Sequence, residues 1–71
     1  MRDQRRIEVN VLGYRIERVM TFKDSGELAA RWYRVLAPES GNVIGTFAQR
    51  AEAEREIVSR ELRALPRSVA A

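Results

Sequence analysis

The sequence predicts an α+β domain: a three-stranded or four-stranded antiparallel β-meander with one C-terminal α-helix packed on one face. Two observations lead to this prediction. Residues 7–47 alternate apolar and polar side chains and are interrupted by turn-forming residues, which is the signal of strands joined by hairpins. Residues 50–65 instead repeat their apolar side chains about every 3.6 residues, as an amphipathic helix does.

The N-terminal part of the alternation falls into two segments. Residues 7–11 (IEVNV) are expected either to extend the first long strand or to add a short edge strand. The long strand covers residues 14–22 (YRIERVMTF), and Arg18 interrupts its apolar face, so this arginine is expected to reach an edge or to find a partner. The apolar face comprises Tyr14, Ile16, Met20 and Phe22, and the opposite face Arg15, Glu17 and Thr21.

Two turns and two more strands follow. Residues 23–27 (KDSGE) and 38–42 (PESGN) are rich in the residue types that form turns. Residues 31–36 (RWYRVL) and 43–47 (VIGTF) are rich in aromatic and β-branched residues and are expected to be strands. One face of the former should carry Arg31, Tyr33 and Val35, and the other Trp32, Arg34 and Leu36. Trp32 and Phe47 are expected to contribute most to the core if they point inward.

The helix is expected from about Arg50 to Leu65, because this stretch has no internal glycine or proline and Pro66 ends it. Ala48 and Gln49 precede it, where Ser, Thr, Asp or Asn usually caps a helix, so the N-terminal cap is expected to be weak.

Charged residues cover most of the helix surface. Glu56 and Arg60 form a favourable i,i+4 pair. Glu54 and Glu61 project between two apolar stripes and are expected either to pair with strand arginines at the rim or to face a second chain. The apolar stripes consist of Ala51, Val58, Leu62 and Leu65, with Ala53, Ile57 and Ala64 beside them.

A chain of 71 residues has room for one thin core, so a single domain is expected. The charged segment MRDQRR, residues 1–6, has no apolar period and is expected to be a basic flexible arm. The domain itself should cover residues 7–66, and residues 67–71 should be a frayed tail.

Composition argues against an enzyme. The chain contains no cysteine and no histidine, which removes thiolate metal sites, the usual zinc ligands and the common nucleophilic arrangements. The carboxylates of the helix point apart and do not form a metal site, so neither a metal nor a cofactor is expected. No apolar run approaches the length of a membrane span and no secretory signal is visible, so a cytoplasmic protein without a membrane partner is expected.

The positive charge is unevenly distributed. The net charge is +3, and residues 1–34 hold eight basic and five acidic residues, whereas residues 35–71 hold five of each. An excess of this kind suits nucleic acid or an acidic protein surface. The alternative is a solvated strand surface with cross-strand pairs, such as Arg15 or Arg34 with Glu17.

The join between the last strand and the helix carries a resemblance. A strand tryptophan, a turn, a Gly-Thr-Phe strand end and an alanine- and glutamate-rich helix start follow one another here as Trp32, Gly45, Thr46, Phe47, Ala51, Glu52 and Ala53. This order resembles the DNA-binding domains of the ethylene-response-factor type and the related arm-binding domains of integrases, over about residues 14–62. The resemblance implies a sheet lying in the DNA major groove. Its candidate contact residues would be Arg15, Arg31, Tyr33 and Arg34, with Arg18 as a further one.

Gly45 has a structural explanation as well, because a missing side chain permits close packing of a helix on a sheet. The sequence therefore favours a small non-enzymatic binding module, of the kind found among phage and plasmid accessory proteins, that contacts DNA or a nucleoprotein complex through the outward sheet face. The alternative is a protein-interaction inhibitor, for example of the anti-CRISPR type, that blocks a partner's surface. An exposed sheet edge or the Glu54 and Glu61 side of the helix also allows a homodimer.

Overall fold

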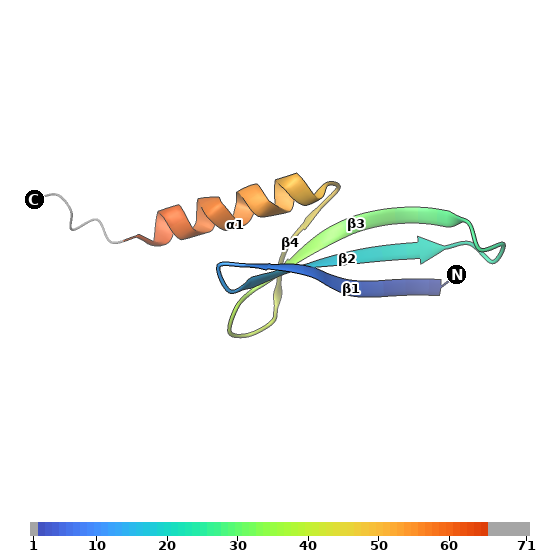
Figure 1. The fold of residues 1–71 in the computed structure, drawn as a ribbon, viewed down its shortest axis with the longest axis horizontal. Coiled ribbons are helices and arrows are strands. Elements are labelled where there is room, and N and C mark those ends of the chain that lie inside the picture. Colours follow the sequence, from blue (N-terminus) through green and yellow to red (C-terminus); the bar gives the residue numbers. More distant parts are fainter. Residues whose placement is uncertain (1, 66–71) are drawn as a thin grey trace, which may run out of the picture.

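The computed structural model describes residues 2–65 and confirms the α+β prediction in its four-stranded form (Figure 1). The antiparallel strands lie in the order β1-β2-β3-β4, so each strand pairs with its neighbour in the sequence. The elements are β1 (Arg2–Val11), β2 (Tyr14–Phe22), β3 (Leu28–Leu36), β4 (Val43–Phe47) and α1 (Arg50–Ala64). This helix is too short and too polar to span a bilayer.

The first strand is longer than the sequence pattern indicated. Residues 2–6, expected to be a flexible arm, form the first half of β1 and pair with β2 from Arg2 opposite Phe22 to Arg6 opposite Arg18. The prediction was wrong because backbone hydrogen bonds, rather than apolar side chains, extend a strand where its neighbour offers a free edge. Both faces of this half are exposed enough to hold charged side chains. The tail predicted at residues 67–71 lies outside the described residues.

A bulge in β1 changes which residues face the helix. The pairing shifts between Ile7 and Val9, so that Glu8 is the extra residue opposite β2. On either side of it, Arg6 and Val9 both lie on the helix side of the sheet, since they pair with Arg18 and Ile16. The side chain of Glu8 also reaches the helix, as its contact with Arg50 shows.

The core lies where the helix covers the sheet. Ile16 and Val35 face each other across β2 and β3, and Ala53 and Ile57 of α1 complete the buried cluster, all with no exposed surface. Phe47 packs against this cluster as expected. Trp32 does not, because it pairs with Val19 on the opposite face of the sheet, where it is half-buried.

The helix covers only part of its face of the sheet. It packs against β2, β3 and β4, starting beside the end of β4 and running away from the N-terminal half of β1 (Figure 1). Its 15 residues span about 22 Å, whereas the ten residues of β1 span about 33 Å. The N-terminal halves of β1 and β3 and the C-terminal half of β2 therefore project beyond the start of the helix. We call them the uncovered ribbon (Figure 1).

The helix has a better cap than its sequence suggested. Gln49 is the N-cap, and the carboxylate of Glu52 accepts a hydrogen bond from the Gln49 backbone N–H at 3.1 Å. This is the glutamate half of a capping box, which satisfies one otherwise unpaired donor. Gly45 is constrained mainly by its own strand, because a Cβ there would lie 2.8 Å from the Phe47 ring.

The hairpin between β1 and β2 contains an unfavourable residue. Leu12 and Gly13 form a two-residue loop, and both have positive φ, 52° and 89°. A loop of this kind favours Asn-Gly, since leucine is strained at positive φ. The side chain of Leu12 is also 62% exposed, so it gains little from burial.

We predict that Leu12→Asn stabilises the protein by about 1 kcal/mol, because asparagine tolerates the left-handed conformation that leucine resists. Thermal unfolding followed by circular dichroism should show a Tm raised by roughly 4–8 °C. An unchanged or lowered Tm would show that the loop stores no such strain.

Two adjacent helix residues test the location of the core. Ile57 is fully buried, whereas Val58 is 47% exposed. Ile57→Ala should lower the free energy of unfolding by about 2–5 kcal/mol, since it leaves a cavity in a thin core. Val58→Ala should change it by no more than about 0.5 kcal/mol in urea denaturation. Equal losses would contradict the packing described.

Candidate functional site

The uncovered ribbon carries arginines on the same face that is apolar beneath the helix. The pairing places Arg6 opposite Arg18, and Met20 between Gln4 and Arg31 in the next row. Arg2 lies one row further, opposite Phe22. We call this surface, together with the first residue of the helix, the open arginine face: Arg2, Arg6, Arg18, Arg31 and Arg50.

Glu8 links this face to the helix. Its carboxylate accepts from Arg18 Nη1 at 2.9 Å and from Arg50 Nη1 at 3.3 Å. Arg50 also donates through Nε to Glu54 at 3.1 Å. The hydrogen bond to Glu54, with a smaller contribution from Glu8, raises the pKa of Arg50 above its usual value. The bulge thus places the carboxylate of Glu8 between Arg18 of β2 and Arg50 of α1.

The positive charge of this face exceeds what Glu8 can neutralise. Arg6 and Arg18 are directly opposite each other on neighbouring strands, an arrangement that is unfavourable for like charges. Within residues 2–65, no carboxylate pairs with Arg2, Arg6 or Arg31. The Nε atom of Arg18 is buried and has no hydrogen-bond partner. An anion bound here would relieve the repulsion and accept hydrogen bonds from the guanidinium N–H groups that reach solvent.

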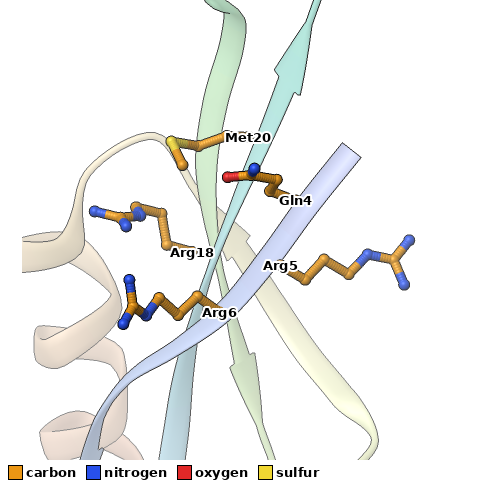
Figure 2. Close-up of a pocket in the computed structure, with 5 residues that line it drawn as sticks. All are labelled: Gln4, Arg5, Arg6, Arg18 and Met20. Carbon is orange, nitrogen blue, oxygen red and sulfur yellow. The ribbon is translucent and has the colours of Figure 1, made fainter. Parts of the chain in front are cut away.

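A depression of about 400 Å³ lies on the ribbon beside the start of the helix. Figure 2 shows Arg6 and Arg18 directed toward the helix side of the sheet and Arg5 directed away from it. Gln4 and Met20 lie beyond the two arginines, further along the ribbon. The depression therefore combines guanidinium groups with an amide and an apolar thioether. Its lining residues are Gln4, Arg5, Arg6, Arg18 and Met20.

The outward face of the sheet is closer to neutral. Arg34 binds Glu17 through Nη2 at 2.7 Å and through Nε at 2.8 Å, which confirms the cross-strand pair that the sequence suggested. Arg5, Asp3 and Arg15 are exposed on this face, and the half-buried Trp32 lies beside the buried Val19. The outward face thus offers an aromatic residue and a smaller excess of cations than the open arginine face.

The structure does not bring the five predicted contact residues together. Arg15 and Arg34 lie on the outward face, whereas Arg18, Arg31 and Tyr33 lie on the helix side. Tyr33 is half-buried and packs against the core cluster, so it is a poor contact residue. The sequence already implied that Arg31 and Arg34 lie on opposite faces. They are three residues apart in one strand, and successive side chains of a strand alternate between the two faces.

Sequence reasoning also missed members of the open arginine face. Arg2, Gln4 and Arg6 were assigned to the flexible arm. They follow one another at intervals of two residues, which is the spacing of side chains on one face of a strand. The bulge at Glu8 interrupts this spacing and hides its continuation into Val9. Arg50 could be found only from the fold, because it approaches Glu8 from a distant part of the chain.

The acidic residues of the helix differ partly from expectation. Glu54 pairs with Arg50 of its own helix and not with a strand arginine. Glu56 binds Arg60 at 2.8 Å, as predicted. Among the described residues, no group of three or more His, Cys, Asp or Glu side chains is arranged to hold a metal ion.

Comparisons with protein-family models, with curated proteins and with solved structures find no match for this chain. The resemblance to plant and integrase DNA-binding domains stays a prediction.

We predict that Glu8→Gln destabilises the protein by about 1–3 kcal/mol, because its side chain is only 16% exposed and balances two guanidinium groups. The matched control is Glu54→Gln, whose side chain is 42% exposed and whose loss should cost no more than about 0.5 kcal/mol. Urea denaturation at low salt measures both. If the two variants lose the same stability, Glu8 does not hold the arginines together.

Proposed function

We propose that this chain is a non-enzymatic module that binds nucleic acid through the open arginine face. The observation that supports this most is the opposed pair Arg6 and Arg18, for which Glu8 is the nearby counter-charge. A phosphate backbone brings a row of negative charges and releases its own counterions when arginines replace them. The guanidinium group also matches the geometry of phosphate oxygens, with two donors in one plane.

The spread of the arginines favours an extended anion over a single small one. Arg2 and Arg6 are separated by about 13 Å along β1, since each residue of a strand advances about 3.3 Å. Arg31 lies two strands away from them, diagonal to Arg18. A chain of phosphates can contact several of these positions at once, whereas an isolated ion reaches only one or two.

The outward face supports a second candidate, docking of a protein partner whose surface the chain would block. Trp32 is half-buried there, and Ile7 and Val43 are each 44% exposed. Tryptophan is enriched among the residues that contribute most of the binding energy at protein contact surfaces. The weak net charge of this face makes nucleic acid the less suitable ligand for it.

A pair of double variants tests which face binds nucleic acid. Arg6→Ala with Arg31→Ala removes two cations from the open arginine face, and Arg15→Ala with Arg55→Ala removes two exposed cations elsewhere. Fluorescence anisotropy with labelled DNA across a salt series should show a log–log salt slope reduced by about two for the first pair, one for each lost phosphate contact. The second pair should keep the slope of the unchanged protein.

The control variant matters because both proteins lose the same charge. Equal loss of affinity in the two would indicate a diffuse charge effect and contradict a defined face. Absence of binding at low salt would overturn nucleic-acid binding itself and favour the protein partner. Circular dichroism of each variant shows whether it is folded, and Arg6→Ala should fold at least as well because it removes a like-charge contact.

A further inference from the structure

We infer that the depression beside the helix start holds one unpaired nucleotide, so that the open arginine face prefers single-stranded nucleic acid to a duplex. This inference rests on the proposed nucleic-acid binding and names the form of nucleic acid that the site takes. It follows from the shape of the depression, from the donors at its edge and from the side chains beside them.

The site is an open hollow on the ribbon and not an enclosed cavity. Its volume of about 400 Å³ lies within the range of pockets that enclose small molecules, about 300–1,000 Å³. A duplex keeps its bases stacked inside and presents phosphates to a surface of this kind. Only a strand with splayed bases can place a base into such a depression.

The donors for the phosphate are at the edge nearest the helix. Arg6 and Arg18 lie opposite each other on neighbouring strands, and both side chains point to the helix side of the sheet (Figure 2). A phosphate between the two guanidinium groups would separate like charges and accept from both. Glu8 holds Arg18 from one side by its ion pair at 2.9 Å, which limits the positions the guanidinium can take.

The next row provides contacts for a base. Met20 lies between Gln4 and Arg31 across the three strands of the ribbon. A thioether packs favourably against an aromatic ring, and a base is such a ring. The amide of Gln4 can donate to and accept from a base edge, while the guanidinium plane of Arg31 can stack on a base. Phe22 follows Met20 by two residues in β2, so it lies on the same face, where it is half-buried. Its ring offers a stacking surface for a neighbouring base.

Three labelled ligands of about twelve nucleotides test this inference, a length within the site sizes of single-strand-binding folds. They are a thymine single strand, the same strand in a duplex with its complement, and an abasic strand with the same phosphates. Anisotropy at one fixed salt concentration measures all three. The thymine strand should bind roughly tenfold or more tighter than the abasic strand and the duplex, as one stacked base predicts.

Variants then separate the base from the phosphate. Met20→Ala should lower the affinity for the thymine strand toward that for the abasic strand without changing the salt slope. Gln4→Ala, at an exposed position of the edge strand, should do the same to a smaller degree and should fold even if Met20→Ala does not. Ile7→Ala, on the outward face, is the matched apolar control and should leave all three affinities unchanged.

The possible failures are distinguishable. Equal affinity for the thymine and abasic strands, or a duplex bound as tightly as the single strand, overturns the nucleotide pocket while leaving nucleic-acid binding intact. Loss of thymine-strand affinity in Ile7→Ala as large as in Gln4→Ala overturns it as well. No salt-dependent binding to any of the three ligands overturns both the pocket and the proposed function.

Discussion

The packing of Ala53 and Ile57 onto Ile16 and Val35 is the contact on which the rest of the molecule depends. These four side chains are fully buried, and they fix the helix over one end of the sheet. The 15-residue helix is shorter than the long strands, so the other end of the sheet receives no cover from it (Figure 1). The elongated arrangement in Figure 1 follows from this single anchor.

One face of the sheet consequently has two environments. Under the helix it carries Ile16 and Val35, and beyond the helix start it carries Arg18 and Arg31. The change falls where α1 begins, and Arg18 is linked through Glu8 to Arg50, the first residue of the helix. Glu8 joins the two regions, because the bulge in β1 brings its carboxylate to cations of both.

Much of the fold could be predicted from the sequence. The period of two in β2 and β3 assigned their side chains to the correct faces, and the start of the helix at Arg50 agreed with the structure. The candidate site was less accessible. Arg2 and Arg6 contain no apolar signal of a strand, and a bulge such as that at Glu8 has no reliable sequence pattern. The predicted residues Arg31 and Arg34 were grouped by nearness in the chain, although alternation separates them by the thickness of the sheet.

The sequence by itself determined the type of the elements from Tyr14 onward and which residues of β2 and β3 share a face, because these properties depend on local backbone periods. Only the tertiary structure decided which face the helix covers and how far the cover extends. Those features depend on contacts between segments distant in the chain, such as Ile57 with Ile16 and Arg50 with Glu8. Arg18 illustrates the difference: its place in an apolar row was visible in the sequence, but its position beside the start of the helix required the fold (Figure 2).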